Sequence, residues 1–147
     1  MNRRLFIRFL SVVAGFVLLP LRAFAARPKA AFDSTTRDDA LTQLYGTSET
    51  VETDRIRIKA PDIAENGAVV PITVKFDIAN AESVSIIAEN NPAPLAASFE
   101  LSEHSGGLVS TRIKMGKTSP VHAVIKAGDK VYRATKEVKV TIGGCGG

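Results

Sequence analysis

The stretch at residues 69–78, "VVPITVKFDI", decides the fold class of this chain. Apolar and polar side chains alternate along it, and this period of two is that of a β-strand with one buried face. The apolar set is Val70, Ile72, Val74, Phe76 and Ile78, and the polar set is Thr73, Lys75 and Asp77. We therefore expect one face of this strand to line a core and the other to meet solvent.

Similar short runs occur on both sides of this strand, separated by Pro, Gly and Asn turn signals. They cover residues 56–58, 84–88, 95–101, 109–115, 121–126 and 131–142. About seven strands without intervening helices predict an all-β, immunoglobulin-like antiparallel β-sandwich. In the last run the inward parity belongs to Tyr132, Ala134, Val138, Val140 and Ile142. We expect these side chains to anchor the chain as far as Ile142.

One short helix is expected before the strands, over residues 34–46. Ser34 or Thr35 is a suitable N-cap, Asp38 and Asp39 suit the first turn, and Gly46 suits the end. Its apolar face consists of Ala40, Leu41 and Leu44.

Residues 1–25 read as an export signal that is cleaved. Arg3 and Arg4 precede an uncharged apolar run at 9–19, and small residues follow at 23–25. The paired arginines indicate the twin-arginine route, with the general secretory route as the alternative. The run of about eleven residues is shorter than the roughly 20 that span a bilayer. We therefore predict an exported protein with no membrane anchor after cleavage.

Removal of the leader changes the charge balance. Its four arginines reduce the 19 basic side chains to 15, which equals the number of acidic ones. A nucleic-acid-binding domain needs a basic surplus, so this function class is excluded. The remaining length suits a single domain, predicted at residues 26–142.

The chain has one cysteine, Cys145, within the terminal sequence "GGCGG" at 143–147. Gly143, Gly144, Gly146 and Gly147 have no side chains to bury, so this segment is predicted to be a flexible arm. A free thiol has a pKa of about 8.5, and no neighbouring base in the sequence activates this one. We therefore interpret Cys145 as a covalent attachment point that other enzymes load and unload, with no catalytic residue in this chain.

Four residues are soft or borderline metal ligands: His104, Met115, His122 and Cys145. No two of them have ligand spacing, so no metal site is predicted. The histidines are expected on the surface or in packing roles, and Met115 in the core. Lys114 and Lys117 could attract an anion, although a solvated surface role is the simpler interpretation.

Together these residues resemble the SoxY family, the sulfur-carrier subunits of bacterial thiosulfate oxidation. The resemblance covers the leader and four segments, of which the last is the strongest. The segments are "IAENGAVVPI" (63–72), "NPAPL" (91–95), "TRIKMGKTSPVHAV" (111–124) and "KEVKVTIGGCGG" (136–147).

The resemblance implies a periplasmic carrier without a cofactor of its own, which holds thiosulfate-derived sulfur on Cys145 as an S-thiosulfonate or persulfide. It implies a heterodimer with SoxZ, a small β-sandwich protein, and an apolar patch on one sheet would mark that partner. It also implies loading by a c-type haem enzyme, sulfate release by a dimanganese hydrolase and, where the pathway includes it, persulfide oxidation by a molybdenum and haem enzyme. The alternative is an exported metal-binding or structural interaction module with an incidental thiol.

Overall fold

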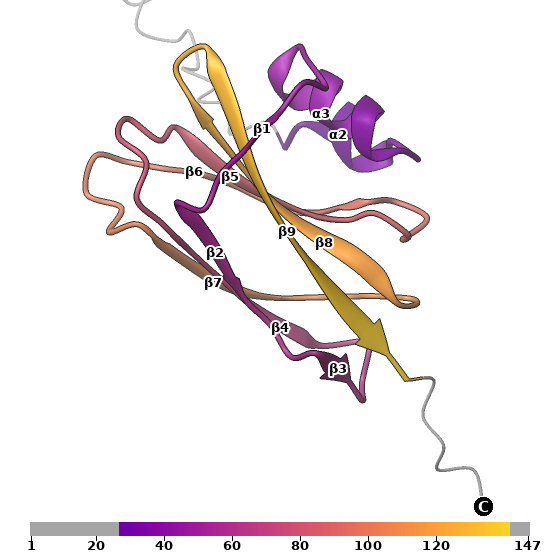
Figure 1. The fold of residues 1–147 in the computed structure, drawn as a ribbon. Coiled ribbons are helices and arrows are strands. Elements are labelled where there is room, and N and C mark those ends of the chain that lie inside the picture. The colour runs from indigo at the N-terminus through magenta and orange to yellow at the C-terminus, as the bar shows by residue number, and fades with distance from the viewer. Residues whose placement is uncertain (1–26, 142–147) are drawn as a thin grey trace, which may run out of the picture.

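A computed structural model describes residues 27–141 of the chain. Within this part, two short helices precede nine strands that form two sheets (Figure 1). The helices are α2 (Lys29–Asp33) and α3 (Arg37–Tyr45). The strands are β1 (Val51–Glu52), β2 (Ile56–Lys59), β3 (Ile63–Ala64), β4 (Val70–Phe76), β5 (Ser83–Ala88), β6 (Leu95–Glu100), β7 (Leu108–Ile113), β8 (Ser119–Ala127) and β9 (Lys130–Val140).

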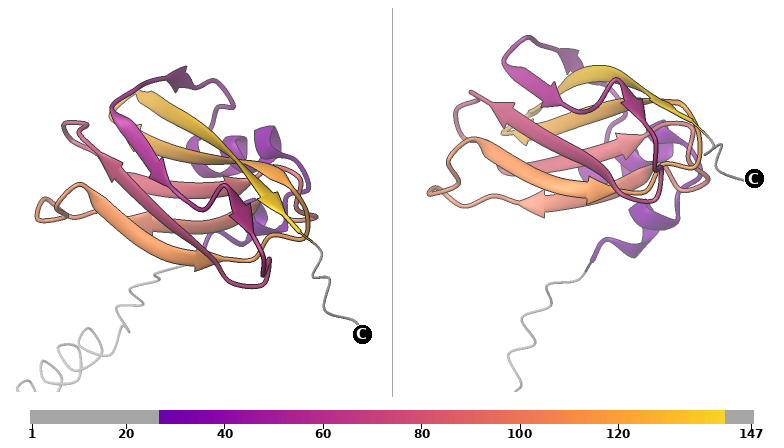
Figure 2. Two further views of the ribbon diagram at one scale, coloured as in Figure 1. Left: turned by 60° about the horizontal axis from the view of Figure 1, so that its bottom comes forward. Right: turned by 90° about the horizontal axis from the view of Figure 1, so that it is seen from below.

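The two sheets face each other as the layers of a sandwich (Figure 2). The larger sheet has the order β1-β9-β8-β5-β6, with β3 also paired to β9, and the smaller has the order β2-β4-β7. The long strand pairs are antiparallel, which confirms the predicted β-sandwich. The two-residue strands β1 and β3 were not predicted, and both run parallel to β9.

The main core lies between the sheets and contains the side chains that the alternation predicted. Val70, Ile72 and Val74 of β4 are fully buried, and Val138 of β9 is equally inaccessible. Tyr132, Ala134 and Val140 pack against the same core. The described part of β9 therefore has the predicted inward parity, whereas Ile142 lies outside the described residues.

A second core lies between the helices and the outer face of the larger sheet (Figure 2). Ala31, Ala40 and Leu41 of the helices pack there against Ile87 and Val124. Consequently β5 is buried on both faces, and all six of its residues are buried.

The helical region differs from the prediction in two ways. The helix expected at 34–46 is present as α3, but its N-cap is Thr36, whose hydroxyl accepts a hydrogen bond from the Asp39 N–H at 3.2 Å. Ser34 instead ends α2, a five-residue helix that was not predicted. Gly46 ends α3 in the left-handed conformation at φ 75°, as expected.

Tyr45 holds α3 to the larger sheet. Its hydroxyl lies 2.7 Å from Ser85 Oγ and 3.4 Å from Ser83 Oγ, both on β5. Burial is the largest influence on this phenol and raises the pKa of Tyr45 above its usual value. The two serine bonds satisfy a polar group that would otherwise be buried without a partner.

Candidate functional site

The predicted attachment residue, Cys145, and the glycines around it lie outside the described residues. The structure does describe the strand that leads to them, as far as Thr141. The candidate site is therefore built from the end of β9 and the segments that hold it.

The end of β9 is hydrogen-bonded along both edges. On one edge the β3 segment accepts two bonds, from the Lys139 N–H to the Asp62 carbonyl at 3.0 Å and from the Thr141 N–H to the Ala64 carbonyl at 3.1 Å. On the other edge the Val140 N–H donates to the Thr118 hydroxyl at 3.0 Å. The backbone is thus held up to the last described residue.

Gly67 allows the segment after β3 to lie close to this strand. Its carbonyl accepts a hydrogen bond from the Met115 N–H at 2.7 Å. A Cβ atom at position 67 would lie 2.3 Å from the Met115 carbonyl oxygen and 3.0 Å from Val140 Cγ1. Only glycine fits between these two groups without a shift of the backbone.

Asn90 and Asn91 hold the connection between β7 and β8, which contains Thr118. The Asn91 side chain donates to the Lys114 carbonyl at 2.7 Å and accepts from the Gly116 N–H at 3.0 Å. The Asn90 side chain donates to the Thr118 carbonyl at 2.9 Å. These bonds fix the backbone on either side of the hydroxyl that accepts from Val140.

Parts of the four segments that carry the family resemblance therefore meet at one end of the sandwich. Gly67 belongs to 63–72, Asn91 to 91–95, and Met115 and Thr118 to 111–124, and all of them support the β9 residues of 136–147. Although far apart in sequence, these segments together surround the last described residues of β9, and we call them the base of the C-terminal segment.

Lys114 and Lys117, for which a solvated surface role was the simpler interpretation and anion attraction the alternative, lie in this same β7–β8 connection and are exposed. They place two positive charges beside the base of the C-terminal segment. Their position suits long-range attraction of an anion.

His122 lies on β8 beneath the helices and is almost fully buried. Its Nε2 atom is 2.7 Å from Glu89 Oε2, and its Nδ1 atom is 2.9 Å from Thr135 Oγ1. Arg37 of α3 lies 3.6 Å from the other Glu89 oxygen. Burial lowers the pKa of His122, against the opposing effect of Glu89. This histidine has the predicted packing role and is not free to act as a base.

Two further residues of metal-ligand type, His104 and Met115, lie in the described part of the chain. His104 is exposed in the β6–β7 connection, and Met115 is 2% exposed within the main core, as expected. In residues 27–141 no cluster of three or more His, Cys, Asp or Glu side chains has the proximity needed to hold a metal ion.

None of the helices in the described part of the chain has the length and apolar character required to cross a membrane.

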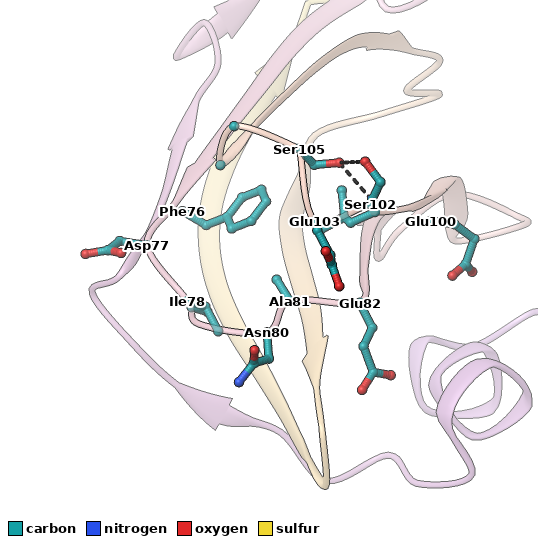
Figure 3. A pocket seen from close by; sticks show the side chains of 13 residues that line it. Phe76, Asp77, Ile78, Asn80, Ala81, Glu82, Glu100, Ser102, Glu103 and Ser105 are labelled. Carbon is teal, nitrogen blue, oxygen red and sulfur yellow. Dashed lines mark hydrogen bonds between the residues drawn. The ribbon is translucent and has the colours of Figure 1, made fainter.

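A cavity of about 810 Å³ lies between the β4–β5 and β6–β7 connections. Asp77, Glu82, Glu100 and Glu103 line it, together with Ser102 and Ser105 (Figure 3). It opens at the Phe76 end of β4, whereas the base of the C-terminal segment lies beside the Val70 end. Its four carboxylates disfavour an anionic ligand, so we do not assign it to the site.

Four residues that support the end of β9 were not predicted from the sequence: Gly67, Asn90, Asn91 and Thr118. Three of them lie within the family-like segments, and Asn90 directly precedes one. Their position in or next to these segments was the one signal in the sequence. Their contacts with β9 and its neighbours could be recognised only from the pairing of the strands in the structure.

Comparison with known proteins agrees with this arrangement. The family model described as "Sulfur oxidation protein SoxY" matches residues 41–145. The solved structure of the sulfur carrier protein SoxY from Chlorobium limicola f thiosulfatophilum matches with a TM-score of 0.65 and 46% sequence identity, covering 71% of this chain and 96% of that chain. No curated protein matches the chain.

Two more distant structural matches have lower scores. A chain from a study of T cell activation by the bacterial superantigen toxic shock syndrome toxin-1 matches with a TM-score of 0.42 and 12% identity, covering 58% of this chain and 99% of that one. The BSP domain of a biofilm associated protein matches with a TM-score of 0.40 and 16% identity, covering 76% of this chain and 18% of that one. The family match and the Chlorobium structure, by contrast, agree over most of the sequence, and the chain belongs to the SoxY family of sulfur oxidation proteins.

Proposed function

We propose that this protein is a non-catalytic, periplasmic sulfur carrier that holds sulfur species covalently on Cys145 and presents them to partner enzymes. The supporting observation is the base at the end of β9, which holds the backbone at Thr141, four residues before Cys145. At about 3.3 Å per residue, four residues give the thiol a reach of roughly 13 Å. The thiol could therefore enter a narrow active site while the sandwich stays outside.

The residues around the end of β9 favour a carrier role over a catalytic role. A nucleophilic cysteine in an enzyme needs a positioned base. His122 is buried with both ring nitrogens occupied, and His104 lies in the connection that lines the cavity at the opposite end. The backbone amides around Val140 and Thr141 are already used in hydrogen bonds. Activation is therefore left to the enzymes that receive the arm.

The chemistry we propose follows from membership of the SoxY family. The Cys145 thiol loses its proton and forms an S–S bond to the outer sulfur of thiosulfate, and a c-type haem enzyme accepts the two electrons released. Water then attacks the sulfonate sulfur in a dimanganese hydrolase, which breaks the bond to the sulfane sulfur and releases sulfate. A persulfide remains on Cys145, and a molybdenum and haem enzyme oxidises its outer sulfur where the pathway includes that step.

We further propose that the protein forms a heterodimer with a SoxZ-like β-sandwich subunit. The large apolar side chains that are more than half exposed in the described residues are Val51, Ile63, Val69 and Leu108. They come from separate elements, although Ile63 and Val69 both belong to the family-like segment 63–72. Copurification of the mature chain with an untagged SoxZ-like protein would test the pairing, and two separate peaks in gel filtration would contradict it.

The carrier function is tested by intact-protein mass spectrometry of the mature chain purified from cells grown on thiosulfate. We expect mass additions of whole sulfur atoms or of a thiosulfate group, removed by a thiol reductant and located on the C-terminal peptide. The matched control is Cys145→Ser, which should carry none. Identical additions on the serine variant, or a wild-type chain without any, would contradict the proposal.

A further inference from the structure

The outer face of the smaller sheet differs from that of the larger one, because none of the described residues covers it (Figure 2). Its outward positions alternate with the buried ones along β2, β4 and β7. They hold four cations and no carboxylate within the strands. We call this surface the basic face, and its outward residues are Arg57, Lys59, Pro71, Thr73, Lys75, Leu108, Ser110 and Arg112.

The cations of the basic face lack the partners that others in the described residues have. Lys29, Arg37, Lys126, Arg133 and Lys136 each have a carboxylate oxygen within 4.0 Å. None of the four cations of the basic face has one among residues 27–141. Asp54 and Asp77 line a shallow depression with Arg57 and Lys75, but they stay beyond ion-pair distance. The face therefore keeps its positive charge although the mature chain is formally neutral.

The pairing of β2 with β4 places like charges opposite each other, and their repulsion disfavours the folded state. Arg57 of β2 lies directly opposite Lys75 of β4, and Lys59 follows Arg57 on the same side of β2. Like charges on directly opposite strand positions are destabilising. Nothing in the packing requires two cations there, because both side chains are exposed. Because the repulsion between these cations destabilises the fold without a packing reason, their presence is consistent with a role in binding.

We propose that the basic face is a docking surface for the acidic surface of a partner protein. Charge complementarity supports this occupant, since the cations extend over three adjacent strands and a single small anion would contact few of them. A lipid surface fits less well, because interfacial binders insert several apolar side chains and the outward positions offer only Pro71 and Leu108. The inference goes beyond the carrier function and does not depend on Cys145.

Binding of a fluorescein-labelled oligoglutamate peptide to the full mature chain, measured by fluorescence anisotropy, tests the surface. We expect the double variant Arg57→Glu with Lys59→Glu to weaken binding by about tenfold or more, and added salt to weaken binding of the wild type. The matched control is Lys29→Glu with Lys130→Glu, which reverses two exposed cations elsewhere and should change affinity by less than about twofold. Cys145→Ser should bind like the wild type, which separates this test from that of the carrier function.

Thermal unfolding supplies an independent readout. Arg57→Glu replaces a like-charge pair with an opposite-charge pair, so its unfolding midpoint should rise by about 1–4 °C while its affinity falls. A fall in the midpoint would contradict the argument from register. Equal losses in the test and control variants, stronger binding to phosphatidylglycerol vesicles than to the peptide, or displacement of the peptide by an equal concentration of inorganic sulfate would each overturn the proposal.

Discussion

The hydroxyl of Thr118 accepts a hydrogen bond from the Val140 N–H at 3.0 Å, and so joins the β7–β8 connection to the end of the last strand. Thr118→Val removes this acceptor while keeping the side-chain shape. We expect a loss of about 0.5–1.5 kcal/mol in the free energy of unfolding and faster amide exchange at Val140. Denaturant unfolding and hydrogen–deuterium exchange measure the two effects.

Thr73→Val is the matched control, because its hydroxyl bonds at 2.9 Å to Ser110 on the neighbouring strand β7 of the smaller sheet and makes no bond to β9. It should leave exchange at Val140 unchanged. Equal exchange in Thr118→Val and the wild type would mean that the hydroxyl does not hold the strand.

Gly67→Ala tests the close contact beside β9. The added methyl group would lie 2.3 Å from a backbone oxygen of Met115, so the backbone must move. We expect a destabilisation of about 1–3 kcal/mol in denaturant unfolding. Gly116→Ala is the control, since its nearest neighbour would be 3.9 Å away, and it should be close to neutral. Similar values for the two variants would contradict the packing argument.

His122 makes the stability of the fold depend on pH. Because burial lowers its pKa in the folded state, the unfolded chain binds the proton more tightly. Stability should be complete above the unfolded value of about 6.5 and fall as the pH drops through the folded value, by at most about 1.4 kcal/mol per pH unit. Glu89 opposes this effect, whereas Arg37 and Arg133 reinforce it.

Urea unfolding between about pH 7.5 and pH 5 measures this slope. His122→Gln should reduce it, and the exposed His104→Gln should leave it unchanged. A slope that is the same in all three proteins would exclude His122 as its source.

Tyr45→Phe removes the hydroxyl that links α3 to β5. The expected loss is about 1–2 kcal/mol in the free energy of unfolding, since Ser85 loses a partner at a buried position. Tyr132→Phe is the control, because no hydrogen bond of its hydroxyl is seen within residues 27–141. A loss in Tyr132→Phe as large as that in Tyr45→Phe would contradict the specific role of Tyr45.

The strands with strong alternation could be predicted from the sequence. Val70, Ile72 and Val74 lie in the core because β4 has one buried face, and Val138 and Val140 follow the same rule on β9. The sequence also indicated a fixed β9, and residues up to Thr141 are indeed held.

Other features required the tertiary structure. β1 and β3 contain two residues each and exist through pairing with β9, so no periodicity could reveal them. The burial of both faces of β5 depends on helices that are distant in sequence. Thr36, Ser34 and Thr35 are all acceptable caps by type, and only the backbone geometry selects Thr36.

The parallel pairing of β1 and β3 with β9 has a mechanical consequence. A pull on the chain beyond Thr141 acts along the axis of β9, while its neighbours resist on both flanks. The backbone bonds of the ladder are then loaded together in shear, and they are not peeled apart one after another. Under the proposed carrier function, in which partner enzymes take up the terminus, this geometry would make the domain harder to unravel from that end.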